Sequence, residues 1–241
     1  DLVATFYIGF KMKNTRSPYT QKKMRQAISY AIDKKRIIDE VVGGLGVAAK
    51  CMIPPELVSC DHVEGYEYNP KKAKEIIQKE GVDLTRPLVI LTGPYIHPIL
   101  KLVEEDLRAL GITCKYKKVS NEQFISSRKL QEGCDMYFYG WYADALEPSS
   151  FIKPLFGSDS ESNLSCYESQ QVMELVEKAA QMANPKKRGE IYEEIQRIIS
   201  EDIPCIPLFH PQNAVCTQDM VHNVNLSPLA MLKYDNIIKE K

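Results

Sequence analysis

The sequence has almost no net charge and no long apolar segment. Its 31 lysines and arginines nearly balance 32 aspartates and glutamates over 241 residues. Without a basic excess, the chain lacks the electrostatic attraction that brings proteins to nucleic acid or to anionic membranes. No apolar run is long enough to cross a bilayer, and the first residues lack the basic and apolar regions of a signal peptide. The length suits one large α/β domain or two small ones, with no nucleic-acid partner.

Motifs of catalysis and of cofactor binding are also missing. The sequence contains no G-x-G-x-x-G, G-x-x-x-x-G-K-[ST], G-x-S-x-G or H-E-x-x-H pattern. The glycines at 43–46 follow a predicted helix rather than a strand, so they are expected to end that helix and not to hold phosphate. These absences predict a protein that is not an enzyme, with no cofactor and no metal site.

Cysteines are numerous but do not have the spacing of metal ligands. They are Cys51, Cys60, Cys114, Cys134, Cys166, Cys205 and Cys216. Cys205, His210 and Cys216 lack the close C-x-x-C spacing of a metal site. At least five of the seven thiols are expected to be small buried hydrophobic groups. Cys60 and His62 leave one catalytic alternative, a thiol-dependent hydrolase. Cys51 and Cys60 flank a double proline and are placed to close a small disulfide.

Hydrophobic periodicity predicts an α/β lobe. Strands are expected at 5–12, 87–92, 112–116, 136–139 and 203–209, and helices at 20–32, 33–42, 69–81, 99–111, 121–131, 172–179 and 184–199. Residues 87–139 therefore alternate strand, helix, strand, helix, strand, which is the order of a parallel βαβαβ unit. The tail after residue 211 is expected to be irregular.

The segment that follows the strand at 136–139 carries the features of a ligand site. Gly140 and Trp141, the only tryptophan, come directly after it, and Asp144 lies three residues later on a loop interrupted by Pro148. Open α/β sheets bind ligands at the carboxyl ends of their strands. An aromatic plane beside a carboxylate suits a ligand with a cation and some apolar surface. The alternative interpretation is a core tryptophan and a loop-capping aspartate.

Several motifs in order along the chain carry a family resemblance. They are YIGFKMKN at 7–14, MRQAISYAID at 24–33, GGLG at 43–46, YNPKKA at 68–73, GWYADALEP at 140–148 and IPLF at 206–209, together with Asn163 and Tyr167. They resemble the C-terminal lobe of extracytoplasmic solute-binding proteins of family 5, the oligopeptide and dipeptide binders of ABC transporters. The resemblance implies an α/β, periplasmic-binding-protein-like (type II) lobe with a mixed, mainly parallel sheet flanked by helices.

The resemblance also implies a division of the chain. Residues 1–12 would be a hinge-crossing strand, residues 13–209 the ligand-binding lobe, and residues 210–241 a return segment toward an N-terminal lobe outside this chain. The protein would be periplasmic or a cell-surface lipoprotein, with its signal region also outside the chain. It would bind peptides in a cleft between two lobes and deliver them to permease subunits of an ABC importer.

Site residues follow from the same resemblance. In similar peptide binders, the aspartate matching Asp144 pairs with the ligand's α-ammonium, and the backbone at Gly140, Trp141 and Tyr142 hydrogen-bonds an extended peptide. Trp141 would also form an apolar wall. Two further cleft contacts are expected, Asn163 and Tyr95.

This sequence departs from the family pattern at two positions. Phe138 stands where some oligopeptide binders carry an arginine, so the peptide's carboxylate would need another partner. Lys11 stands where asparagine is common, which is expected to alter the hinge. Relatives of this class also take nickel chelates, haem or oligosaccharides, and these remain alternative ligands.

Overall fold

A six-stranded sheet forms the middle layer of the protein, whose computed structural model describes residues 2–127, 130, 133–229, 231–233 and 236–239. The strands within these residues are β1 (Ala4–Phe10), β2 (Gly46–Ala48), β3 (Leu88–Thr92), β4 (Cys114–Lys118), β5 (Met136–Tyr142), β6 (Cys205–Pro211), β7 (Val221–His222), β8 (Asn225–Leu226), β9 (Leu232–Lys233) and β10 (Ile238–Lys239). The helices are α1 (Lys22–Ala31), α2 (Lys34–Val41), α3 (Pro70–Glu80), α4 (Pro98–Arg108), α5 (Asn121–Ile125), α6 (Ser149–Phe156), α7 (Gln170–Gln181) and α8 (Pro185–Asp202), and Pro18–Thr20 form a 3-10 turn.

The sheet combines a parallel part and an antiparallel part. Its strands lie in the order β2-β6-β1-β5-β3-β4. Strands β4, β3 and β5 are parallel, which confirms the βαβαβ unit, whereas β2, β6, β1 and β5 pair antiparallel in turn. The predicted mixed sheet is confirmed, but "mainly parallel" was wrong. Periodicity does not report the direction of strands that are joined through distant parts of the chain, as β1 and β6 are.

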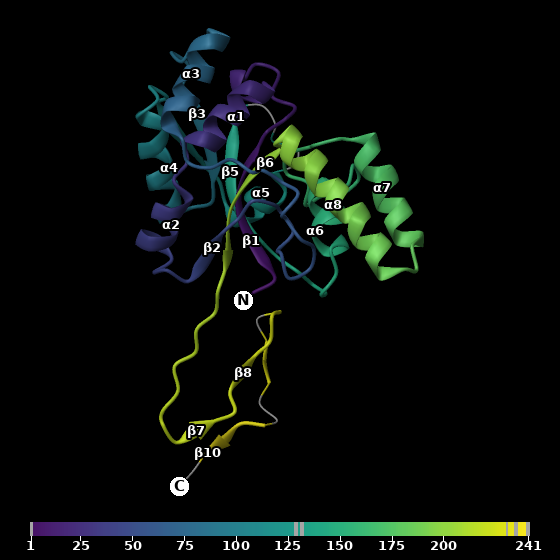
Figure 1. Ribbon diagram of the computed structural model, residues 1–241. Helices are drawn as coiled ribbons and strands as arrows, with labels where there is room; N and C mark the ends of the chain where they lie inside the picture. The colour runs from purple at the N-terminus through teal and green to yellow at the C-terminus, as the bar shows by residue number, and fades with distance from the viewer. Residues whose placement is uncertain (1, 128–129, 131–132, 230, 234–235, 240–241) are drawn as a thin grey trace.

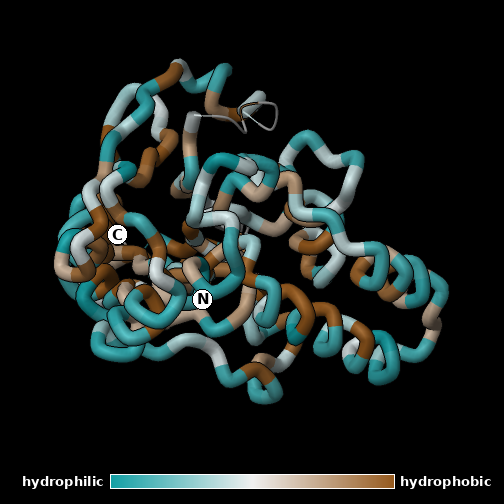
Figure 2. Tube along the Cα trace, turned by 90° about the horizontal axis from the view of Figure 1, so that it is seen from above, coloured by the Kyte–Doolittle hydropathy of each residue, from teal (hydrophilic) through white to brown (hydrophobic). Residues whose placement is uncertain are grey.

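Two hydrophobic cores lie on opposite faces of the sheet. Helices α1 to α4 cover one face and helices α5 to α8 the other (Figure 1). Alternate residues of each strand serve the two cores, so Ile8 and Met136 pack in the first, and Tyr7 and Tyr137 in the second. The outer turns of the helices are mostly hydrophilic (Figure 2). No helix within the described ranges is both long and apolar enough to span a bilayer.

Local sequence signals explain most helix ends. The Asp33 side chain accepts a hydrogen bond from Arg36 N–H (2.9 Å) at the start of α2, as its position in the sequence predicts. Gly81 ends α3 in the left-handed region, at φ 61°. The helix expected from residue 20 begins only at Lys22, because Thr20 lies in the preceding 3-10 turn and Gln21 occupies the cap position without a side-chain hydrogen bond.

Three segments differ from the prediction. Strand β5 continues past Gly140 to Tyr142, and helix α6, which was not predicted, begins directly after Pro148. Proline does not break a helix at that position, because its missing N–H would have no intrahelical partner there. The helix expected at 121–131 forms at Asn121–Ile125, and part of its remainder lies outside the described residues. The tail contains two short two-stranded ladders instead of being wholly irregular.

The start of the chain meets the end of β6 and part of the tail at one edge of the sheet. The N–H of Leu2 donates to the carbonyl of Pro211 at the end of β6 (3.1 Å), and the N–H of Val3 to Pro228 in the tail (2.8 Å). From this edge the tail extends away from the body (Figure 1). The geometry is compatible with strands that cross toward another lobe, and the predicted limits at 1–12 and 210–241 stay predictions.

His210 makes folding at this edge sensitive to acid. Its ring is 5 % exposed, with Nδ1 3.0 Å from Thr5 Oγ1 and 3.2 Å from the carbonyl oxygen of Ala4. Burial lowers the pKa of His210 to about 4, so the unfolded chain takes up a proton first as the pH falls. The associated stability is present above about pH 6.5 and is lost as the pH falls toward 4, by about 2 kcal/mol between pH 7.5 and 5.

Denaturant unfolding of wild type and His210→Gln at both pH values measures this contribution. Glutamine keeps a polar side chain but does not titrate, so the stability advantage of wild type over the variant should shrink by that amount at pH 5. An advantage independent of pH would show that the imidazole does not carry the effect.

Candidate functional site

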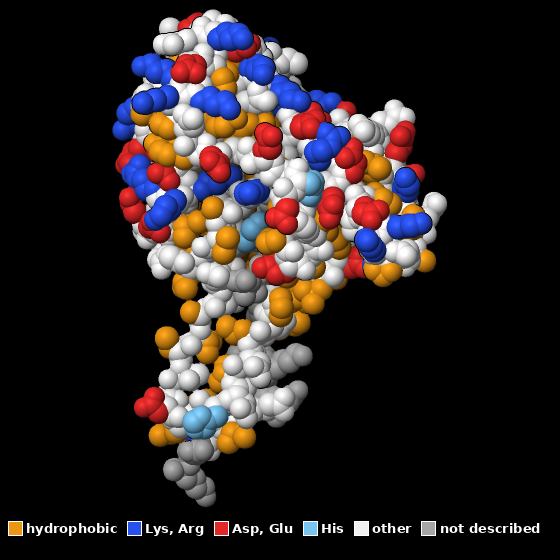
Figure 3. Space-filling view, in the orientation of Figure 1, with side chains coloured by type: hydrophobic (Ala, Val, Ile, Leu, Met, Phe, Trp, Pro, Cys, Tyr) orange, Lys and Arg blue, Asp and Glu red, His pale blue; other side chains and the backbone are white. Residues whose placement is uncertain are grey.

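The carboxyl ends of β3 and β5 lie at the edge of the sheet from which the tail extends. The exposed apolar side chains on the segments at this edge, here named the apolar edge, are Leu45 (43 % exposed), Val47 (51 %), Tyr95 (87 %), Tyr142 (49 %) and Leu146 (54 %). Figure 3 shows hydrophobic side chains along the lower border of the body, above the tail. Several exposed apolar side chains at one edge are typical of an interaction or ligand-binding face.

Strand β5 is paired unequally on its two sides. It pairs with β1 along its whole length, from Phe10 opposite Met136 to Ala4 opposite Tyr142. Its pairing with β3 is limited to Met136 and Tyr137. Beyond Tyr137, β5 has no partner residue on β3, so this part of the strand forms a sheet edge on the β3 side.

The direction of the backbone groups along this edge follows from one hydrogen bond. Ala143 N–H donates to the carbonyl of Val3 (2.9 Å), so Trp141 also directs its backbone groups toward β1. Because the direction alternates, Gly140 and Tyr142 direct their N–H and C=O groups to the other side. Among the described residues, no protein group is seen to hydrogen-bond there, so these groups are available to an added strand.

Asp144 follows this edge by two residues. Its side chain is exposed, and no ion pair to it is found in the described part of the chain. The neighbouring acid, Glu147, lies 3.6 Å from Arg188, so the two carboxylates differ in their surroundings. Asp144 is therefore placed to bind a cation that arrives at the end of β5.

Trp141 is half-buried rather than sealed in the core. Its indole Nε1–H donates to the carbonyl of Ser150 (2.7 Å), which ties the first turn of α6 to β5. Part of the ring packs against the core beneath α6 to α8. The tryptophan thus shapes the 143–148 loop that carries Asp144, and its partial exposure is compatible with the predicted apolar wall.

Gly140 allows close packing across the sheet. A Cβ atom built at this position would lie 2.6 Å from the ring of Phe6, its partner on β1. Phe6 also stacks on Phe209 (5.0 Å between centroids) and meets Tyr142 edge to face (5.9 Å). Prediction from sequence missed Phe6, since its place beside the site depends on the β1–β5 register.

Two predicted contacts lie in different environments. Tyr95 is exposed on the turn after β3, at the apolar edge. Asn163 is fully buried, and its side-chain amide donates to the carbonyls of Gly157 (3.0 Å) and Tyr167 (2.9 Å). The expectation that Asn163 contacts ligand is therefore corrected, because its polar groups are used to shape its own loop.

Lys11 holds the loop that contains Asn163 at the end of the sheet remote from Asp144. Its Nζ donates to the carbonyls of Ser127 (2.8 Å) and Leu164 (2.9 Å), directly after β1 ends. Asp144 lies beyond the opposite end of β1, about 20 Å away for a seven-residue strand. Burial lowers the pKa of Lys11 to about 8. Lys11 thus joins β1 to two loops, at the end of the sheet away from the candidate site.

Phe138 and His97 lie beside the same edge. Their ring centroids are 4.8 Å apart, and His97 also caps α4, with Nδ1 3.3 Å from Ile99 N. Phe138 stacks on Phe6 as well (5.9 Å). His97, Phe138 and Phe6 thus form an aromatic row. It gives apolar surface at the position where some oligopeptide binders carry an arginine. The sequence signal for His97 was weak, because a histidine before proline has no fixed meaning.

The structure does not assemble the thiol-dependent alternative. His62 Nε2 lies 2.8 Å from the carbonyl oxygen of Glu193, whereas the Cys60 thiol is directed at the carbonyl of Ile53 (3.6 Å). No cluster of three or more histidine, cysteine, aspartate or glutamate side chains suited to a metal ion occurs in the described ranges. The chemistry at the β5 edge is that of binding: an unpaired strand, a free carboxylate and apolar surface.

Comparison with known proteins identifies the family. Residues 2–163 match the model described as "Bacterial extracellular solute-binding proteins, family 5 Middle". The chain belongs to this family. The fold class and the resemblance stated from the sequence are thereby confirmed, and similar curated proteins bear the names of binding proteins.

These similar proteins have different named ligands. The chain is 30% identical to Di/tripeptide-binding protein 1 of Pseudomonas aeruginosa over 240 residues, covering 95% of this chain and 44% of that protein. It is 29% identical over 215 residues to Heme-binding protein A of Haemophilus influenzae, covering 85% and 39%. The solved structure of HbpA2 from Haemophilus parasuis superposes with a TM-score of 0.87 at 25% identity, covering 100% of this chain and 49% of that one. The chain thus spans about two fifths of the length of these curated relatives.

Proposed function

We propose that this chain is the C-terminal lobe of the substrate-binding component of an ABC importer, and that the complete protein binds peptides between two lobes. The observation that carries the proposal is the unpaired side of β5 at Gly140 and Tyr142, with the free carboxylate of Asp144 at its end. The relative named for di- and tripeptides, 30% identical over nearly the whole chain, supports the choice of ligand.

The two parts of the site recognise two parts of a peptide. An extended peptide would exchange main-chain hydrogen bonds with Gly140 and Tyr142, as an added strand. Main-chain pairing is independent of side chains, so it tolerates many sequences. Asp144 would pair with the α-ammonium, and this charge-assisted bond gains strength when a closing lobe excludes water.

The apolar edge is the surface that we assign to the N-terminal lobe of the same protein. Its side chains, Tyr95 and Leu146 among them, are too exposed to serve the two cores of this lobe. Peptide binding would favour a closed arrangement of the lobes, and the closed form would engage the permease outside the cytoplasm. The protein performs no chemistry in this proposal.

Blocking the peptide's ammonium tests the proposal from the ligand side. In calorimetric titrations of the two-lobed protein, a dipeptide with a free amino terminus should bind at least about 30-fold more tightly than its N-acetylated form, because acetylation removes the cation. The isolated lobe should bind either ligand weakly, since half of the contacts are absent. Equal affinities for the free and acetylated dipeptides would contradict the proposal.

Haem is the second candidate ligand, because a relative named for haem matches this chain at 29% identity. The half-buried His97 beside Phe138 offers an imidazole at the β5 edge. Absorbance titration of the two-lobed protein with haem distinguishes the candidates: saturable haem binding together with no peptide binding would favour this one.

A further inference from the structure

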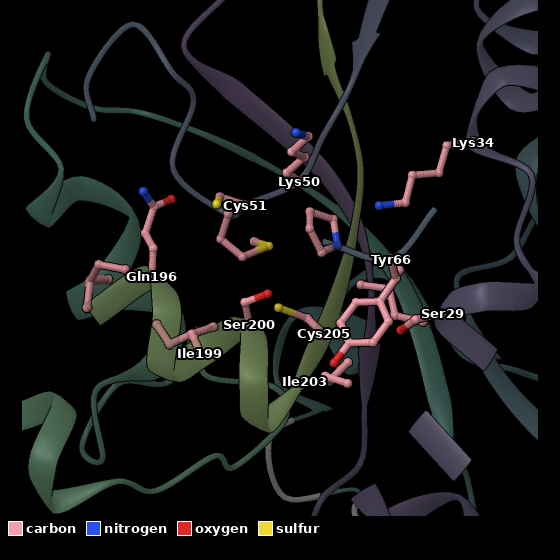
Figure 4. Close-up of a pocket in the computed structure, with 14 residues that line it drawn as sticks. Ser29, Lys34, Lys50, Cys51, Tyr66, Gln196, Ile199, Ser200, Ile203 and Cys205 are labelled. Carbon is pink, nitrogen blue, oxygen red and sulfur yellow. The ribbon is translucent and has the colours of Figure 1, made fainter. Parts of the chain in front are cut away.

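A strap formed by residues 49–66 crosses the side of β6 and carries two cysteines. Ala49 N–H donates to the carbonyl of Leu208 on β6 (3.0 Å), and the Thr5 hydroxyl on β1 donates to the carbonyl of Met52 (2.9 Å). Figure 4 shows Cys51 from this strap above a narrow pocket, with Gln196 from α8 on one side and Cys205 from β6 below. The strap therefore joins α8 to β1 and β6, the strands that begin and end, respectively, at the edge that carries the candidate site.

The strap reverses direction between its two cysteines. Leu57 N–H donates to the carbonyl of Pro54 (3.0 Å), which closes a turn at the double proline. The returning chain brings the Cys60 thiol to within 3.6 Å of the carbonyl oxygen of Ile53. Gln196 Oε1 accepts the N–H of Ile53 (3.1 Å) and lies 3.9 Å from Cys60 Sγ, so α8 holds both arms of the turn.

The two thiols lie on the two arms of this turn. Each thiol shifts the pKa of the other, and both cysteines are reduced in the structure. Cys51 is 3% exposed, whereas Cys60 is only partly buried. Because Cys60 Sγ lies 3.6 Å from the carbonyl oxygen of Ile53, two residues from Cys51, this short loop needs little rearrangement to bring the two sulfurs to bonding geometry.

We propose that Cys51 and Cys60 form a disulfide that locks the strap against α8 and β1. The proposal rests on the extracytoplasmic location that belongs to the proposed function, because disulfides form and persist in oxidising compartments. The oxidant would be another disulfide, either a small molecule such as glutathione disulfide or the reactive disulfide of an oxidase. By fixing the strap, the bond would hold Met52 on Thr5, next to the start of β1.

The surroundings of the thiols assign the order of the exchange. The interaction between the two side chains lowers the pKa of Cys60 and raises the pKa of Cys51, and burial raises the pKa of Cys51 further. The Cys60 thiolate, which is also the more accessible, would attack one sulfur of the oxidant and displace the other as a thiolate. Cys51 would then lose its proton and attack the Cys60 sulfur. The protein is oxidised by two electrons, and the oxidant leaves as two thiols.

Peptide mapping tests the bond directly. The chain is incubated in a glutathione redox buffer, its free thiols are alkylated, and it is digested without reduction by a protease that cuts after glutamate. Cleavage after Glu40, Glu56 and Glu64 separates Cys51 from Cys60, because Glu56 lies between them. Peptides 41–56 and 57–64 should be recovered joined, with a mass two hydrogens below their sum.

Thermal unfolding gives a second measure. Oxidised wild type should melt on the order of 5 °C above reduced wild type, and Cys51→Ser should abolish this redox difference. Cys216→Ser, at an exposed cysteine of the tail, should keep it. Recovery of both cysteines as separate alkylated peptides, or of Cys60 joined to glutathione or to a different cysteine, would overturn the proposal. No peptide ligand enters either measurement, so a failure of the proposed function would leave both results unchanged.

Discussion

Replacing Asp144 by asparagine in the two-lobed protein should weaken binding of a free dipeptide by at least about 30-fold. The substitution keeps the size of the side chain but removes the charge that pairs with the ligand's ammonium. Loss of one partner from a desolvated charge pair costs about 2 to 5 kcal/mol, because the other charge is left unpaired. Calorimetric titration of wild type and variant with the same dipeptide measures the effect.

The neighbouring acid provides a matched control. Glu147 lies on the same loop, and Glu147→Gln also removes one negative charge, but its partner is Arg188. If Asp144 binds the ammonium directly, Glu147→Gln should change peptide affinity by less than about threefold. An exposed charge that does not contact the ligand has only a small electrostatic effect. Similar losses in both variants would instead indicate a general electrostatic effect.

An acetylated ligand completes the comparison. Because N-acetylation already removes the ammonium, Asp144→Asn should produce no further large loss with the acetylated dipeptide. Folding should be unaffected, since Asp144 is exposed. A variant that binds the free dipeptide as wild type does would exclude the ammonium pairing.

The position of the candidate site was predictable from sequence, but its shape was not. The aromatic strand before Gly140, the single tryptophan and the acid three residues later are all local signals. The unpaired side of β5 arises from where β3 stops relative to it, and β1 sets the direction of its backbone groups. Register between distant segments is a tertiary property, so no local pattern reports it.

Asn163 illustrates the opposite error. The family resemblance suggested that this residue, in a loop after the ligand motif, contacts the ligand. In the fold its amide is consumed by the carbonyls of Gly157 and Tyr167, and the loop docks on Lys11 at the far end of β1. Sequence proximity to a motif does not determine which end of a sheet a loop covers. The helical elements were more predictable, because caps such as Asp33 act within one turn.

Replacing Gly9 by alanine should be the most destabilising single change considered for this lobe. The Cβ of alanine would lie 2.1 Å from Cζ of Tyr137, the residue opposite on β5. That ring is 2 % exposed in the core beneath α6 to α8, so it has no space into which to move. Overpacking of a tight core costs about 1 to 3 kcal/mol, and a contact this short places the loss near 3 kcal/mol or above.

A second substitution distinguishes steric overlap from backbone effects. In Gly9→Ala with Tyr137→Leu, the smaller side chain leaves room for the new methyl group, so the two changes should be less destabilising together than their sum. Gly189→Ala is the matched control, because nothing lies within 4 Å of its Cβ position and it is inside α8. There, alanine should stabilise the protein by roughly 0.5 to 1 kcal/mol through helix propensity.

Denaturant unfolding of wild type, Gly9→Ala, Tyr137→Leu, the double variant and Gly189→Ala measures these free energies. Since Tyr137 lies at the last β5 position paired with β3, the Gly9 contact also fixes where the free side of β5 begins. A Gly9→Ala variant as stable as wild type, or additive losses in the double variant, would show that the Tyr137 ring does not require glycine opposite it. In that case the β1–β5 register, and with it the direction assigned to the Gly140 and Tyr142 backbone, would need another explanation.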